Sequence, residues 1–206
     1  MQRVYVITHP EATHHVDRLV GGWYDSELTD RGRAQAERIA GFIRTEIPAE
    51  ASTQLVSSDL ARTAQTAAVI AAALGVDPVL DGGLREKSYG VAEGRSQAWL
   101  DDRFIFPPAH GERLEHDEGI DGGETKREWI ERAYSAVARI ESTQAEHRVV
   151  VTHGGTANWV IAAWMRIPVV GCAYAAFRVP TGSVTILEED ERFHNRTLMT
   201  LGKRDF

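Results

Sequence analysis

Short runs of β-branched and aromatic residues alternate along the chain with longer stretches of helical periodicity, and this alternation restricts the fold more than any other feature. Strands are predicted near residues 4–8, 54–57, 148–152, 183–187 and 195–201. Helices are predicted at 29–47 with Thr29 as N-cap, from Ser58 to Leu74 with Gly75 as terminator, at 124–146 and at 157–165. The alternation predicts an α/β fold, a three-layer α/β/α sandwich with a mostly parallel central sheet. We expect a single domain over residues 1–206.

The charge and cysteine content of the 206 residues argue against several functional classes. A formal net charge of −7 disfavours a general nucleic-acid or anionic-membrane surface, because such surfaces need a basic field. The apolar stretch near the N-terminus is too short for a signal peptide, and no window is long enough to span a membrane. The single cysteine, Cys172, excludes an internal disulfide framework and favours a cytoplasmic location. Because the net charge is negative, any phosphate site must be a local cationic pocket.

The region from Gly82 to Gly123 lacks sustained periodicity, and residues 95–120 within it predict an insertion that covers the substrate as a lid. The insertion contains Trp99, Phe104 and Phe106, followed by two prolines. These aromatic side chains could grip an apolar leaving group. Under a long loop, however, such residues more often form a small core of their own, and we favour that interpretation.

Polar residues gather where three predicted strands end. The three clusters are Thr8 with His9, residues 57–62, and residues 152–155. Because ligand sites of parallel sheets lie beyond the carboxyl ends of the strands, one crevice could collect all three clusters. Taken alone, His9 and His153 could each be a hydrogen-bonded histidine at the rim of the core, and Arg62 an ordinary surface residue of a helix. Together they favour a phosphate site.

Five short motifs, in order and over nearly the whole chain, resemble those of one enzyme family. Val-Ile-Thr-His-Pro-Glu at 6–11 resembles an Arg-His-Gly-Glu motif and is followed, in the family's order, by Gly22, Trp23, Asp25, Leu28, Thr29 and Gly32. Ser-Ser-Asp-Leu at 57–60, with Arg62, Thr63, Gln65 and Thr66, is similar to the second motif. The others are Leu-Arg-Glu at 84–86 with Gly90, Glu93 and Gly94, Gly-Glu-Thr at 123–125, and Val-Thr-His-Gly-Gly at 151–155. On these residues the chain is identified as a member of the histidine phosphatase superfamily, in its phosphoglycerate mutase-like branch.

The resemblance implies a metal-independent phosphatase that acts on a small phosphorylated substrate through a phosphohistidine intermediate, with no cofactor. His9 would attack the phosphorus, Arg62 and His153 would donate to the phosphoryl oxygens, and Glu86 would protonate the leaving group. These roles suit the side chains, since a neutral imidazole is nucleophilic and a guanidinium is a planar, permanently charged donor. Glu86 could instead be part of a charged loop. The substrate-binding residues that the resemblance implies are Thr8, His15, Gly21, Arg85 and Gly154. The chain could also act as a homodimer.

The first motif departs from the family pattern at three positions. Thr8 stands where the family has an arginine, Pro10 replaces a glycine, and His15 replaces an asparagine. Loss of one charged donor costs about 3 kcal/mol in comparable sites, which makes weak activity an alternative outcome. His14, His15 or Arg18 could replace the cation, and Thr8 could donate its hydroxyl. A zinc site formed by the histidines of this loop is disfavoured, because no clear set of metal ligands accompanies them.

Two other functions remain open at this point. A phosphoglycerate-type mutase would transfer phosphate between hydroxyls, but it would need more basic residues than the insertion offers. Hydrolysis is favoured by the acidic run in and next to the insertion, which consists of Glu112, Glu115, Asp117, Glu118 and Asp121. The second alternative is a repurposed pocket that binds a ligand without hydrolysing it. A structure in which a side chain fills the pocket would favour this alternative.

Overall fold

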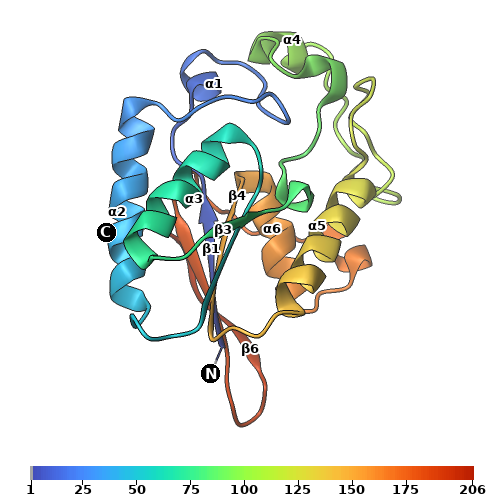
Figure 1. Cartoon of the computed structure of the whole chain (residues 1–206). Helices are drawn as coiled ribbons and strands as arrows, with labels where there is room; N and C mark the ends of the chain where they lie inside the picture. Colours follow the sequence, from blue (N-terminus) through green and yellow to red (C-terminus); the bar gives the residue numbers. More distant parts are fainter. Residues whose placement is uncertain (1) are drawn as a thin grey trace.

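The computed structural model describes residues 2–206 and contains a six-stranded sheet (Figure 1). The strands are β1 (Gln2–Thr8), β2 (Thr53–Ser57), β3 (Pro78–Leu80), β4 (His147–Thr152), β5 (Val184–Glu189) and β6 (Arg196–Lys203). Their order is β3-β2-β4-β1-β5-β6. The first four in this order run parallel to one another, and β5 is antiparallel to both of its neighbours. The prediction of a mostly parallel sheet is confirmed. The short edge strand β3 was not predicted.

Helices cover both faces of the sheet (Figure 1). The helices α2 (Asp30–Glu46) and α3 (Ala61–Leu74) pack on one face, and α5 (Lys126–Glu141) and α6 (Gly154–Trp164) on the other. Successive residues of β1 pack alternately into the hydrophobic cores on the two faces of the sheet. Val4 and Val6 pack with α5 and α6, whereas Tyr5 and Ile7 pack with α2 and α3. This period of two is the expected result for a strand that is buried on both faces, and it produces the predicted three layers.

The helix ends follow local chemistry where a suitable residue is present. The Thr29 side chain accepts from the backbone N–H of Gly32, and Gly75 ends α3 in the left-handed conformation with φ 70°. The prediction that Ser58 caps α3 is wrong. The helix begins at Ala61, and its first amide donates to the Asp25 carboxylate at 2.6 Å. A carboxylate supplied from another segment cannot be found from local sequence.

Two further helix boundaries differ from the prediction. The helix α6 begins at Gly154, three residues earlier than expected, directly after His153. The helix α5 is shorter than expected at both ends, and a capping box of Thr125 and Glu128 fixes its start. Both tryptophans of α6, Trp159 and Trp164, are buried.

The segments beyond the carboxyl ends of the strands hold two short helices, α1 (Thr13–Val16) and α4 (Gln97–Asp101), at the top of Figure 1. Short 3-10 turns occur at Gly82–Leu84 and Gly90–Ala92, and another, Val169–Ala173, follows α6. Leu100 and Ile120 of the segment 95–120 form a small core with Val20 and Ala92, and Tyr89, Trp99 and Phe104 pack against it. The interpretation of a separate small core is therefore confirmed, but Phe106 lies outside it.

Within residues 2–206, none of the helices has the length and apolarity that crossing a membrane requires.

Candidate active site

A cavity of about 360 Å³ opens where β1, β2 and β4 end. Its walls come from six segments that are distant in sequence. The lining residues are His9, His14, His15, Leu19, Gly21, Gly22, Arg62, Glu86, Tyr89, Gln97, Trp129, His153, Gly154, Gly155 and Thr181. The three polar clusters of the sequence thus meet in one place, and the cavity is open rather than filled by a side chain.

His9 leaves β1 with a defined tautomer. Its backbone N–H donates to the Thr152 carbonyl at 3.0 Å, which ties the residue to the end of β4. Its Nδ1 lies 2.8 Å from the Pro10 carbonyl, an acceptor that requires the proton on Nδ1. Nε2 then carries no proton, and its lone pair faces the cavity as the acceptor of a hydrogen bond from Arg62. Burial, and next the charge of Arg62, hold the pKa of His9 well below its ordinary value, so the imidazole is neutral.

Arg62 lies in the first turn of α3 and points into the cavity. Its guanidinium donates to His9 Nε2 at 3.2 Å, to the Tyr24 carbonyl at 2.8 Å and to the Gly22 carbonyl at 2.7 Å. Only 1% of the residue is exposed, and burial lowers its pKa to about 10, which leaves it charged at neutral pH. All three acceptors are uncharged groups. The buried positive charge is therefore available to an anion in the cavity.

His153 follows β4 and meets His9 edge to face, with the ring centroids 5.1 Å apart. Its Nε2 lies 3.0 Å from the Ser58 hydroxyl. Among residues 2–206, its Nδ1 is one of four buried side-chain polar atoms without a hydrogen-bond partner. An unpaired buried polar atom is costly unless a ligand satisfies it. Burial and the charge of Arg62 keep the pKa of His153 well below its ordinary value, so the unliganded ring is neutral.

Glu86 is held at the N-terminus of α6. Its Oε2 accepts from the Gly155 amide at 2.9 Å, and its Oε1 accepts from the amides of Thr156 at 3.0 Å and Lys87 at 3.1 Å. Oε2 keeps a free lone pair for a proton. Backbone donors fix the carboxyl group in the wall of the cavity, although Glu86 lies in a loop between the charged residues Arg85 and Lys87.

His14 and His15 come from the short helix α1 and also line the cavity. His14 Nδ1 lies 2.6 Å from the Ser26 hydroxyl, and the His15 ring stacks 5.6 Å from the His9 ring. The His15 Nδ1 accepts from the Ala12 amide at 3.1 Å, which places its proton on Nε2. Burial lowers the pKa of His14 to about 3 and also lowers that of His15. The cavity thus carries one permanent cation and four neutral imidazoles.

Comparison with known proteins decides the family. The model of the histidine phosphatase superfamily (branch 1) matches residues 4–200. The chain belongs to the histidine phosphatase superfamily. "Probable phosphoglycerate mutase GpmB" of Salmonella paratyphi C is 32% identical over 169 residues, which cover 82% of this chain and 77% of the relative.

Solved structures with the same fold are known. A mycobacterial glucosyl-3-phosphoglycerate phosphatase, solved with VO3, matches with a TM-score of 0.78 and 25% identity over 98% of both chains. The product of a Mycobacterium tuberculosis open reading frame matches with a TM-score of 0.72 and 29% identity over 98% of this chain and 97% of that one. The family and its phosphatase neighbours support a phosphatase enzyme.

Three residues of this histidine phosphatase that the sequence placed near the substrate do not line the cavity. Thr8 is fully buried, and its hydroxyl donates to the Pro180 carbonyl at 2.6 Å and accepts from the Ser183 amide at 3.0 Å. Arg85 is engaged by both oxygens of Asp59, at 2.7 and 2.5 Å. Arg18 is exposed and lies outside the lining. Other partners thus occupy the polar groups of Thr8 and Arg85, and the substrate-binding roles expected for them stay predictions.

The remaining predicted residues, including Gly21 and Gly154, do line the cavity. A side chain at Gly21 would lie 2.9 Å from His14 Nε2, so the glycine makes room for that imidazole. Sequence reasoning missed Tyr89, Gln97, Trp129 and Thr181, which carry no signal that separates them from ordinary core or surface residues. Over residues 2–206, no group of three or more potential ligands is arranged to hold a metal ion.

Proposed function

We propose that this protein hydrolyses a small organic phosphomonoester without a metal ion, through a phosphohistidine at His9. The observation that carries the proposal is the state of His9 in an open cavity. Its Nδ1 is tied to a carbonyl, and its Nε2 faces the charged guanidinium of Arg62 at 3.2 Å. A neutral nucleophile beside a fixed cation is what attack on a phosphoryl group requires.

In the first step His9 Nε2 attacks phosphorus and the ester P–O bond breaks. Glu86 gives its carboxyl proton to the departing alkoxide, while Arg62 moves its hydrogen bond from His9 to a phosphoryl oxygen. In the second step water attacks the phosphohistidine, Glu86 takes the proton of the water, and the P–N bond breaks. Inorganic phosphate leaves, and His9 and Glu86 return to their starting protonation states. The Ser58 hydroxyl donates to His153 Nε2, so the ring proton of His153 is on Nδ1. Nδ1 then donates a hydrogen bond to a phosphoryl oxygen.

Thr8 is proposed to stand in the place of the arginine of the Arg-His-Gly-Glu motif. His14 and His15 then supply part of the missing donor capacity, because both line the cavity and His15 directs its Nε2 proton away from the Ala12 amide. An anionic phosphate favours protonation of these imidazoles. Turnover of His15→Ala tests this role, and an unchanged rate removes His15 from it.

The test of the main proposal is phosphate release in the presence of EDTA, from wild type, His9→Ala and the control His194→Ala, whose side chain is 73% exposed in the β5–β6 turn. We expect release by wild type and the control and none by His9→Ala. A rapid quench in alkali, where phosphohistidine persists, should trap a phosphoryl group on wild type and on the control but not on His9→Ala. Release that survives in His9→Ala contradicts the proposal.

The mutase alternative is tested in the same assay by adding an acceptor alcohol and measuring transfer against release. One guanidinium lines the cavity, which favours hydrolysis over retention of a bisphosphorylated intermediate. Assembly as a homodimer and a cytoplasmic location, the latter argued from the lone Cys172, are kept as parts of the proposal.

A further inference from the structure

A second cavity adjoins the first and is not used by the proposed chemistry. Its volume is about 320 Å³, and it is lined by Tyr89, Gln97, Leu100, Asp101, Phe104 and Phe106. Tyr89 and Gln97 also line the cavity that holds His9. A phosphomonoester whose phosphorus is placed for attack by His9 therefore has its ester substituent within reach of this second space.

The second cavity is mostly apolar, and one of its aromatic walls, Phe106, belongs to none of the hydrophobic cores of the described residues. Leu100 belongs to the small core of the insertion, and Phe104 packs against it. Phe106 is 80% exposed and forms a T-shaped pair with Phe104, with the ring centroids 5.1 Å apart and the planes at 64°. A large aromatic side chain exposed to this extent beside a cavity adds little to stability and offers a surface for a ligand.

The charges around the second cavity disfavour an anionic substituent. Asp101 and Glu86 are the acidic side chains in the two linings, and Arg62 is the cationic one. Three nearby cations are engaged elsewhere. Lys87 is buried in an ion pair with Glu118, and Arg95 and Arg103 lie over the Trp99 ring at 4.9 and 4.3 Å. Arg18, whose carbonyl accepts from the Gln97 amide at 2.8 Å, is exposed and outside both linings. Among the described residues no cation lines the second cavity, so a second carboxylate or phosphate placed in it would meet the Asp101 carboxylate.

We infer that the second cavity is the subsite for the leaving group, and that it selects phosphomonoesters of uncharged aromatic or branched aliphatic alcohols over those of sugar acids. The inference rests on the proposed phosphatase function. Phe106 is its specificity-determining residue, because a ring stacked on Phe106 is removed from water between two aromatic walls.

The test compares substrates whose leaving groups differ in apolar area but are both simple alkoxides, 2-phenylethyl phosphate and ethyl phosphate. We expect kcat/KM to be at least about tenfold higher for the phenylethyl ester, and Phe106→Ala to reduce this ratio by about five- to tenfold. Phe106→Leu should keep most of the ratio. Glycerate 3-phosphate should be a poorer substrate than the phenylethyl ester.

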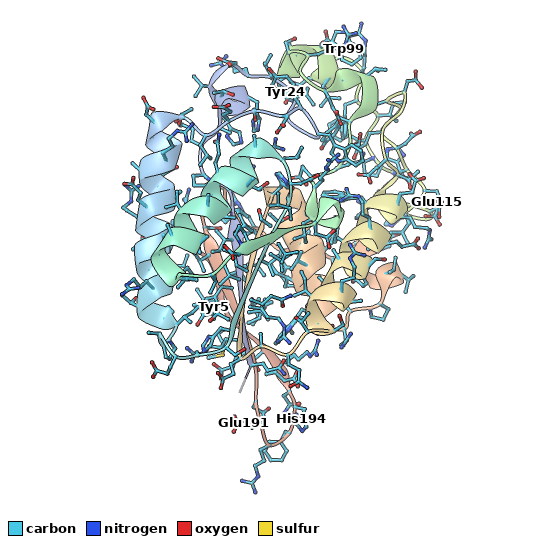
Figure 2. All side chains as sticks on the ribbon, in the orientation of Figure 1. Tyr5, Tyr24, Trp99, Glu115, Glu191 and His194 are labelled. Atoms are coloured by element: carbon cyan, nitrogen blue, oxygen red, sulfur yellow. The ribbon has the colours of Figure 1, made fainter. Side chains whose placement is uncertain are left out.

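The matched control is Phe193→Ala. Phe193 is 69% exposed in the turn that carries Glu191 and His194, at the opposite end of the molecule from Trp99 (Figure 2). The ratio should not change in this variant. A Phe106→Ala enzyme that loses activity on both esters equally, or a preference for glycerate 3-phosphate, overturns the inference.

Binding of the matching phosphonates separates this inference from the catalytic proposal, because it needs no turnover. Calorimetry should give 2-phenylethylphosphonate a Kd about tenfold below that of ethylphosphonate, and Phe106→Ala should remove most of the difference. Absence of turnover with this preference intact overturns the proposed hydrolysis and leaves the subsite standing. Equal affinities overturn the subsite.

Discussion

At the scale of single residues, the site depends on one guanidinium that holds three segments together. Arg62 joins the nucleophile His9 to the loop of Gly22 and Tyr24 through three hydrogen bonds in different directions. Hydrogen bonds in three directions require the three nitrogens of a rigid, planar guanidinium, because an ammonium group has a single nitrogen. The residue therefore both charges the cavity and shapes it.

Replacing Arg62 with lysine should consequently fail although the charge is kept. We expect Arg62→Lys to lower kcat/KM by about 100-fold or more, the range seen when one positioned donor is removed from a charged transition state. Steady-state kinetics on a phosphomonoester measures this. Arg44→Lys is the matched control, since Arg44 is exposed and donates only to the Ala73 carbonyl at 2.8 Å. Equal kinetics for Arg62→Lys and wild type would contradict the role.

The buried histidines make stability depend on pH. The pKa of His14 is about 3 in the folded protein and about 6.5 in an unfolded chain. Between these values the unfolded chain binds a proton that the folded protein does not, so the free energy of unfolding falls as pH drops from 6.5 towards 3. Each such histidine contributes a slope of at most about 1.4 kcal/mol per pH unit, and His9 and His153 act in the same direction.

The change to test this is His14→Gln, which removes one of these groups. In urea unfolding between pH 6 and 4.5, we expect the slope of the unfolding free energy against pH to decrease by about 1 kcal/mol per unit. Above pH 7 the variant and wild type should differ by a constant amount. Parallel curves over the whole range would show that His14 is not the group concerned.

At the scale of elements, the start of α6 links fold and site. Its first amides donate to Glu86, and Trp129 from α5 donates its indole N–H to the Thr156 hydroxyl at 2.8 Å. A side chain at Gly155 would lie 2.5 Å from Trp129 and 2.6 Å from Glu86 Oε1. The close approach of α5, α6 and Glu86 therefore requires glycine here.

Gly155→Ala should accordingly displace Glu86 and Trp129, and we expect kcat to fall by about tenfold or more while the fold persists. Gly41→Ala is the matched control, because a side chain at this exposed position of α2 meets nothing within 4 Å. It should raise the free energy of unfolding by about 0.5–1 kcal/mol and leave kcat unchanged. Phosphate release and urea unfolding report the two effects. Full activity of Gly155→Ala would contradict this view of α6.

At the scale of the whole molecule, the insertion is docked on the site segment by a buried ion pair. Lys87, next to Glu86, pairs with Glu118 of the insertion, and the two side chains are 2% and 18% exposed. Removing one charge of a buried pair leaves the other without compensation, which costs about 3 kcal/mol. The pair therefore couples the stability of the insertion to the placement of Glu86.

Glu118→Gln should lower the free energy of unfolding by about 2–4 kcal/mol and speed proteolysis within the insertion. The matched control is Glu115→Gln, because Glu115 pairs with Arg127 at the surface, as its position in Figure 2 shows. That change should cost less than about 1 kcal/mol. Equal costs for the two variants would show that the Lys87 pair does not hold the insertion.

The sequence by itself determined the elements and the residues that meet at their ends. The period of two in β1, the cap at Thr29 and the terminator at Gly75 are local properties, and they specify strands and helices without reference to the rest of the chain. Placing His9, Arg62 and His153 after strands or at a helix start then brings them together, because parallel strands end at one edge of the sheet.

Only the tertiary structure decided which of two neighbouring polar side chains faces the cavity. Thr8 is held by Pro180, 172 residues along the chain, and Arg85 by Asp59, so their hydrogen bonds were satisfied away from the site. The tautomer of His9, the capping of α3 by Asp25 and the second cavity beside Phe106 likewise depend on contacts between distant segments. Such contacts are set by packing, which leaves no periodic or spaced pattern in the sequence.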